Sequence, residues 1–126
     1  MKTIVIIDDE FGLADVLSAT LSDSGFRVHV ASNGVQGLAA VREQSPDLVL
    51  LDYMMPILDG PGVLRAMQAD ERMARIPVLL MSSLPESTVR ARCAGFIAFL
   101  HKPFAFEVLL DAVEKAVGPG AASEPL

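Results

Sequence analysis

The 126-residue sequence has very little cysteine and no long apolar run, and both absences limit what the protein can be. Its single cysteine, Cys93, has no partner for an internal disulfide. No apolar stretch approaches the roughly 18 residues that a membrane-spanning helix needs, so we expect no membrane partner. The N-terminus lacks a cationic region, an apolar segment and a cleavage site. The sequence therefore predicts a cytoplasmic protein without a signal peptide.

Basic residues are also scarce. Lys and Arg number 10 against 16 Asp and Glu, which gives a formal net charge of −6. Direct contact with nucleic acid needs a basic face, so we expect none. By contrast, 52% of the residues are hydrophobic, which is typical of a folded domain. We predict one domain at residues 1–118 and a flexible C-terminal tail at 119–126.

Short apolar runs alternate with helical patterns five times along the chain. The runs are rich in Val, Ile and Leu, as in parallel strands that are buried on both faces. We expect strands at 3–8, 26–31, 48–52, 78–82 and 97–101, and helices at 11–24, 34–44, 62–70, 86–94 and 105–117. Right-handed crossovers between such strands predict a three-layer α/β/α sandwich around a five-stranded parallel sheet.

The second strand and the fourth helix differ from the others. In the strand, Phe26, Val28 and Val30 alternate with Arg27 and His29. This alternation predicts an edge strand with one solvated face. The helix at 86–94 is expected to be short, because little chain separates Pro85 from Gly95.

Polar side chains follow four of the five predicted strands. They are Asp8, Asp9, Asp52, Ser82 and Lys102. In open parallel sheets the carboxyl ends of the strands share one edge, where ligands bind. Any one of these residues alone has an ordinary structural explanation, such as a helix cap. Four strand ends with suitable groups together predict a functional site.

The converging carboxylates predict a divalent cation. Acidic groups that lie close together raise one another's pKa unless a cation compensates them. Oxygen ligands suit Mg²⁺, and Mn²⁺ is the alternative. We expect Asp9 and Asp52 as direct ligands, the backbone carbonyl of Met54 as a third, and Asp8 acting through water.

The remaining groups suit a phosphoryl ligand. Lys102 supplies a second positive charge and Ser82 a hydroxyl, and both can contact anionic oxygens. Phosphoryl transfer depends mostly on positioning and charge neutralisation, and aspartate is a known nucleophile for it. The sequence thus predicts Asp52 as a phosphoryl acceptor.

These motifs together resemble the receiver domain of two-component response regulators, over about residues 1–117. The acidic pair lies in IIDDE, and the acceptor strand and loop in LVLLDYMMPILDG. The resemblance implies Ser82, in VLLMSS, as the switch hydroxyl. In FIAFLHKPF it implies Lys102 as the conserved-type lysine, Phe99 as the switch aromatic, and a cis bond before Pro103.

By that resemblance the fold is flavodoxin-like, with strand order 2-1-3-4-5. The protein would not be an enzyme but a signalling switch. It would take a phosphoryl group from a phosphohistidine of a histidine kinase or phosphotransfer protein. Phosphorylation would then change the surface of the fourth helix, fifth strand and fifth helix to control an effector protein. The sequence does not decide whether phosphorylation also produces a homodimer, since the fourth helix is short.

Three other functions compete with this interpretation. An aspartate-based phosphatase usually has a second Asp two residues after the nucleophile, where this chain has Met54. A flavin carrier needs a phosphate loop after the first strand, where Asp8, Asp9 and Glu10 would repel phosphate. A degenerate receiver that acts as a phosphorylation-independent docking module is the remaining alternative. Met54 and Leu84, both apolar beside the expected site, further predict slow loss of a phosphoryl group.

Overall fold

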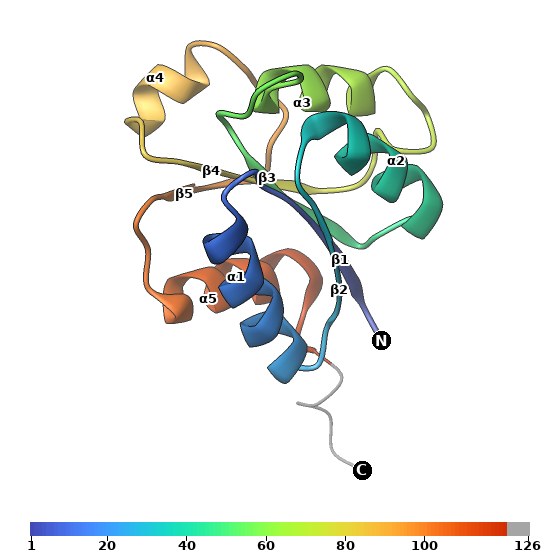
Figure 1. Cartoon of the computed structure of the whole chain (residues 1–126), viewed down its shortest axis with the longest axis vertical. Coiled ribbons are helices and arrows are strands. Elements are labelled where there is room, and N and C mark those ends of the chain that lie inside the picture. Colours follow the sequence, from blue (N-terminus) through green and yellow to red (C-terminus); the bar gives the residue numbers. More distant parts are fainter. Residues whose placement is uncertain (121–126) are drawn as a thin grey trace.

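The computed structural model describes residues 1–120 as alternating strands and helices around one sheet (Figure 1). The strands are β1 (Thr3–Ile7), β2 (Arg27–Ala31), β3 (Leu48–Asp52), β4 (Val78–Ser82) and β5 (Ala98–His101). The helices are α1 (Phe11–Asp23), α2 (Gly34–Gln44), α3 (Gly60–Gln68), α4 (Glu86–Arg90) and α5 (Phe106–Val117). All neighbouring strands are parallel, in the order β2-β1-β3-β4-β5, which confirms the predicted topology. Residues 121–126 of the predicted tail lie outside the described residues.

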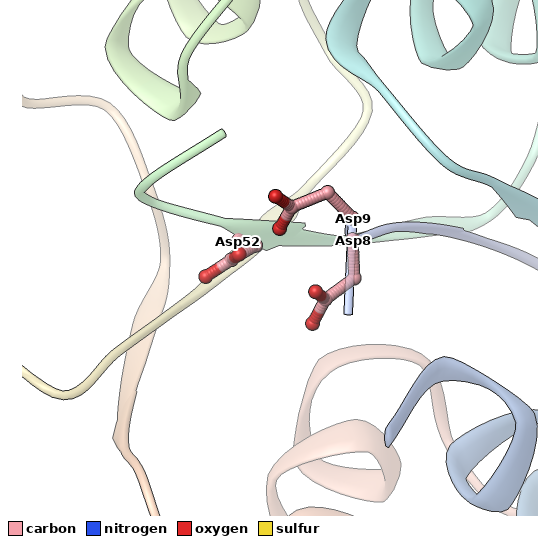
Figure 2. A group of neighbouring side chains, drawn as sticks. All are labelled: Asp8, Asp9 and Asp52. Atoms are coloured by element: carbon pink, nitrogen blue, oxygen red, sulfur yellow. The ribbon is translucent and has the colours of Figure 1, made fainter. Parts of the chain in front are cut away.

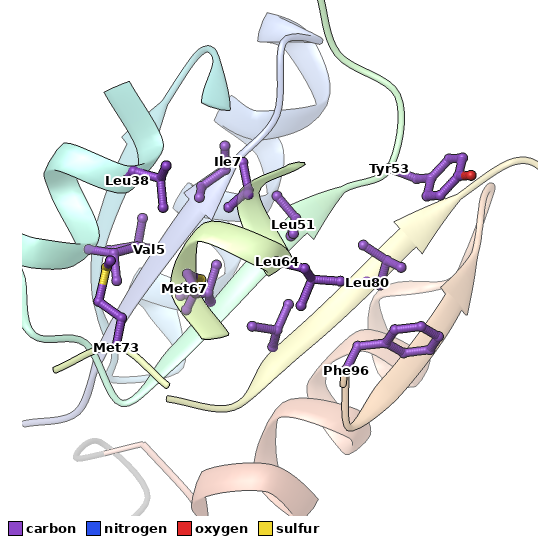
Figure 3. Close-up of a cluster of buried hydrophobic side chains, with 14 of the residues drawn as sticks. Val5, Ile7, Leu38, Leu51, Tyr53, Leu64, Met67, Met73, Leu80 and Phe96 are labelled. Carbon is purple, nitrogen blue, oxygen red and sulfur yellow. The ribbon is translucent and has the colours of Figure 1, made fainter. Parts of the chain in front are cut away.

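Helices cover both faces of the sheet, so the molecule has three layers. Helices α1 and α5 lie on one face and α2, α3 and α4 on the other (Figure 1). Each face has its own apolar cluster, and Figure 3 shows the one beneath α2 and α3. Because β3 and β4 are covered on both faces, each of their residues is buried. Within residues 1–120, no helix combines the length and apolar character needed to cross a bilayer.

The edge strand β2 departs from its predicted pattern. Its place at the end of the sheet is confirmed, and Phe26 is buried. Val30, however, is 46% exposed although the alternation placed it with the buried residues. Val30 lies on a pocket of about 270 Å³ that is also lined by Phe11 and Asp15 of α1, so the helix does not cover this end of the strand.

Two helices, α3 and α4, differ from their predicted bounds by two residues or more. Helix α3 begins at Gly60, two residues early, because the Asp59 side chain caps it by accepting a hydrogen bond of 2.9 Å from the Gly62 backbone. Helix α4 ends at Arg90 rather than near residue 94. The chain forms a turn directly after it, and Gly95, with a φ of 98°, lies in the irregular segment that leads to β5.

The loop between β3 and α3 holds a strained residue. Ile57 has a φ of 74°, a region that β-branched residues rarely adopt, and it is 83% exposed. The Leu58 amide donates to the Pro56 carbonyl at 2.8 Å across this turn. The loop therefore keeps an unfavourable backbone conformation with little burial of the side chain in return.

Ile57→Asn is expected to stabilise the protein, because asparagine tolerates positive φ and little apolar area is lost. The gain should be about 1 kcal/mol, which corresponds to a melting temperature roughly 4 °C higher. Thermal unfolding followed by circular dichroism measures it. Ile57→Val keeps the branched side chain and should leave the melting temperature unchanged. An asparagine variant that melts below the wild type would contradict this explanation.

Candidate functional site

The structure brings the predicted strand-end residues together at one edge of the sheet. Asp8 and Asp9 follow β1, Asp52 ends β3, Ser82 ends β4 and Lys102 follows β5. These four strands are successive neighbours in the sheet, so their carboxyl ends lie side by side. The predicted convergence is confirmed.

Loop structure fixes the position of Asp52. The Gly60 amide donates to the Tyr53 carbonyl at 2.9 Å, which folds the β3–α3 loop back onto the end of β3. A Cβ atom at Gly60 would lie 2.8 Å from the Asp52 carbonyl oxygen, so only glycine fits. The start of α3 thus packs directly against the backbone of Asp52 and Tyr53 at the end of β3.

The three carboxylates form a compact cluster (Figure 2). One oxygen from each of Asp8, Asp9 and Asp52 lies within 4.8 Å of the others. Asp9 is exposed, whereas Asp8 and Asp52 are 1% and 6% exposed. A hard cation with six oxygen ligands at about 2.1 Å needs oxygens gathered in this way, with waters at the remaining positions. The cluster therefore fits Mg²⁺ after a small inward movement of the side chains.

Lys102 joins two of these acids. Its Nζ donates to Asp8 Oδ2 and to Asp52 Oδ1, both at 3.2 Å. The other oxygen of Asp8, Oδ1, accepts the Glu10 amide at 2.8 Å. Asp8 is thus buried and bonded through both oxygens, while Asp9 is open to solvent. That Asp8 acts through water and Asp9 as a direct ligand stays a prediction.

Burial and charge shift the protonation of the site. Burial, with repulsion by Asp8 and Asp9, raises the pKa of Asp52 to about 7 even though Lys102 lowers it. Burial alone would lower the pKa of Lys102, but attraction by Asp52 and Asp8 outweighs it and raises that pKa. The lysine therefore stays charged. The ionised form of Asp52 is destabilised in this environment, and binding of a further cation would stabilise it.

An open pocket of about 460 Å³ lies over the cluster. Its lining combines carboxylates, an amine and hydroxyls with an apolar rim: Asp9, Glu10, Leu13, Asp52, Met54, Ser82, Ser83, Lys102, Pro103 and Phe104. Such a lining can hold a small anion once a cation offsets the acids. The Lys102–Pro103 bond is cis, as the resemblance implied.

The two predicted switch residues lie on adjacent strands. Ser82 is 3% exposed, and its Oγ accepts a hydrogen bond of 3.0 Å from the Leu84 amide. In the strand register Phe99 pairs with Leu80, two residues before Ser82. Phe99 is partly buried against the cluster beneath α2 and α3. The aromatic ring and the hydroxyl thus belong to one local region of β4 and β5.

The apolar residues beside the site separate in the structure. Met54 is 61% exposed and lines the pocket over the carboxylates. Leu84 is partly buried against the core and lines a neighbouring groove instead. Sequence reasoning missed Ser83, which also lines the pocket. Its only signal was that it directly follows Ser82 at the end of a strand.

Comparison with known proteins identifies a family with this sequence pattern. The family model for the response regulator receiver domain matches residues 4–114. Sporulation initiation phosphotransferase F of Bacillus subtilis is 30% identical over 90% of this chain and 92% of that protein. The DNA-binding dual master transcriptional regulator RpaA of Synechocystis is 37% identical over 90% of this chain. The chain spans only 48% of RpaA, about half its length.

Solved structures agree in fold. Chemotaxis protein CheY4 of Vibrio cholerae is 26% identical with a TM-score of 0.84, over 92% of this chain and 98% of that one. The receiver domain of a sensor histidine kinase from Pseudomonas aeruginosa is 28% identical with a TM-score of 0.86, over 93% and 98%. That structure has a magnesium ion coordinated in its active-site cleft. With a matched family model over most of its length, this chain belongs to the response regulator receiver domain family.

Proposed function

We propose that this chain is a phosphorylation-dependent signalling switch in which Asp52 accepts a phosphoryl group. The observation that carries the proposal is the shared contact of Lys102 with Asp52 and Asp8, beside an open pocket that Asp52 and Lys102 line. The donor would be a phosphohistidine of a histidine kinase or of a histidine phosphotransfer protein. A Mg²⁺ or Mn²⁺ ion held by Asp9, Asp52 and the Met54 carbonyl, with Asp8 through water, would neutralise phosphoryl oxygens.

The chain's own residues account for the transfer. A carboxylate oxygen of Asp52 attacks phosphorus, forming an O–P bond while the P–N bond of the phosphohistidine breaks. Lys102 then exchanges its contact with Asp52 for one with a phosphoryl oxygen. The pocket of about 460 Å³ is lined by the exposed residues Met54 and Asp9, and we expect the donor imidazole to enter from this solvent side.

Signalling would follow from a new hydrogen bond at Ser82. Its hydroxyl donates to the phosphoryl group, and Phe99 moves into the space that the shift leaves. The surface of α4, β5 and α5 changes as a result, and an effector protein reads that change. Phosphorylation thus shifts a population between two states, because the Ser82 contact exists only with the phosphoryl group present.

The partners of the proposed switch are proteins. Relatives include regulators described as DNA-binding, but the described elements of this chain form the receiver fold alone, and its net charge of −6 does not favour DNA. We propose residues 1–118 as the working domain, located in the cytoplasm. A docking module independent of phosphorylation is the weaker alternative, because it would not need Asp52, Lys102 and Ser82 in one pocket.

Incubation with acetyl phosphate and Mg²⁺, followed by intact mass measurement, tests the proposal. We expect a gain of one phosphoryl group in the wild type and none in Asp52→Asn. Omitting Mg²⁺ or adding a chelator should also prevent the gain. An unchanged wild-type mass under these conditions, with a histidine-phosphorylated donor protein also failing, would reject the switch in favour of the docking module.

Met54→Asn is expected to shorten the lifetime of the phosphorylated protein. Met54 offers no group that can orient water at the pocket mouth, whereas an asparagine amide can hydrogen-bond an attacking water. One such bond corresponds to decay about fivefold faster. Decay of the added mass after removal of acetyl phosphate gives the rate. Met54→Leu should decay like the wild type, and equal rates for all three proteins would refute the idea.

A further inference from the structure

The end of β5 carries a histidine that the proposed chemistry does not use. The Nε2 atom of His101 lies 3.0 Å from the carbonyl oxygen of Ser83, in the loop that follows the switch residue. We infer that His101 is a positioning residue: it holds the segment 82–84 in its resting place and so opposes acceptance of a phosphoryl group. This inference rests on the proposed function. It adds a residue that shifts the equilibrium between the resting and the phosphorylated state of the switch.

The sheet register places His101 directly beside Ser82. The two residues are paired across β4 and β5, as are Leu80 and Phe99. Since side chains alternate along a strand, His101 and Phe99 share one face of β5, and Leu100 points to the cluster on the other face. His101 therefore lies on the same side of the sheet as the switch aromatic.

Three hydrogen bonds fix the segment in the structure. The Lys102 amide donates to the Ser82 carbonyl at 2.8 Å, which extends the ladder between the strands. The Leu84 amide donates to Ser82 Oγ at 3.0 Å. The His101 ring adds the bond to the Ser83 carbonyl. Of these three, the His101 bond alone comes from a side chain outside the segment.

These bonds belong to the resting arrangement. We expect Ser82 to move toward a phosphoryl group on Asp52 when its hydroxyl donates to it, and to carry Ser83 and Leu84 with it. The His101–Ser83 bond then stretches, because His101 stays in the β5 ladder. A contact made in only one of two states lowers the apparent affinity of any ligand that selects the other. Removing the donor at position 101 should therefore tighten binding of a phosphoryl analogue.

Beryllium trifluoride with saturating Mg²⁺ is a suitable probe, because it mimics a phosphoryl group on aspartate without turnover. His101→Gln keeps an N–H at about the reach of Nε2, His101→Asn places it one bond too short, and His101→Val has none. We expect His101→Asn and His101→Val to bind the probe about threefold more tightly than wild type, the effect of one exposed hydrogen bond. His101→Gln should bind like wild type. Titrations report through the fluorescence of Tyr53, the single tyrosine, in a chain without tryptophan.

Mg²⁺ titrations without the probe separate positioning from general damage. Ion affinity does not involve Ser82, so all four proteins should bind Mg²⁺ equally. Unchanged or weaker probe binding in both His101→Asn and His101→Val overturns the inference, as does a His101→Gln variant that behaves like His101→Val. If the wild type binds Mg²⁺ but not the probe, the proposed phosphoryl acceptance itself fails and the role of His101 with it. Should His101→Val unfold, the asparagine and glutamine pair still decides.

Discussion

Asp52→Asn is expected to make the metal-free protein more stable at pH 8, by about 2–4 kcal/mol, while abolishing its uptake of a phosphoryl group. Burial, together with repulsion by Asp8, raises the pKa of the Asp52 carboxyl to about 7. The same carboxyl in an unfolded chain has a pKa near 3.9. Each unit of difference corresponds to about 1.4 kcal/mol, so the ionised carboxylate costs the folded state several kcal/mol. Asparagine has nearly the same shape and no charge.

The direction of the pH dependence follows from this raised pKa. Between about pH 4 and pH 7 the folded protein holds a proton on Asp52 that the unfolded chain has lost. The wild type therefore loses stability as the pH rises through this window, and the loss levels off above pH 7. The advantage of Asp52→Asn should be largest at pH 8 and nearly absent at pH 4.

Urea unfolding in the presence of a chelator measures the difference at both pH values. Asp70→Asn is a matched control, because hydrogen bonds from Arg72 lower the pKa of that partly exposed carboxyl and its removal should give no gain. Added Mg²⁺ should shrink the advantage of Asp52→Asn, since the ion stabilises the wild type by binding its folded state. An Asp52→Asn protein that is less stable than wild type at pH 8 without metal would show that Asp52 is structural.

The sequence was sufficient to predict the sheet and the convergence of the strand-end residues, because both depend on where the strands end. Apolar runs locate the buried strands, and in a parallel sheet each run ends at the same edge. Asp52 and Lys102 are 50 residues apart, yet the alternation of strand and helix alone predicts that they meet. The contact of 3.2 Å between their side chains confirms it.

Details that depend on tertiary packing could not be predicted in this way. Val30 follows the period of its strand but is exposed, because the nearby end of α1 does not cover it. The left-handed backbone of Ile57 conflicts with the preference of an isoleucine, so no local rule would place it there. The bond between His101 and Ser83 requires the register of β4 against β5, which single-sequence patterns do not determine.

Lys102→Met is expected to slow phosphorylation by acetyl phosphate about 100- to 1,000-fold. Lys102 Nζ contacts Asp52 before transfer and would contact the phosphoryl oxygens during it. Loss of one such fixed donor from a transition state typically has an effect of this size. Methionine fills a similar volume without a charge, so the change removes the cation and little packing.

The same variant should be less stable than wild type, the opposite of Asp52→Asn. Lys102 is largely buried, and it neutralises Asp8 and Asp52, which have almost no contact with solvent. Removing one partner of such a buried pair typically destabilises a protein by about 3–5 kcal/mol. Since the pKa of Lys102 is raised in the folded state, its contribution is complete below about pH 10 and is lost only above it. The loss should therefore be seen throughout pH 7–9.

Measurement of Mg²⁺ binding separates two roles of Lys102, the contact with phosphoryl oxygens and the neutralisation of the buried acids. Without the positive charge of Lys102 nothing opposes the attraction of the three carboxylates for Mg²⁺, so the ion should bind at least as tightly as to the wild type. The slower phosphorylation then cannot result from a missing metal. Lys115→Met is the matched control, because Lys115 pairs with Asp111 at 2.9 Å on the surface and should affect neither rate nor stability appreciably. A Lys102→Met protein that is phosphorylated at the wild-type rate with Mg²⁺ bound would show that the lysine only neutralises the buried acids.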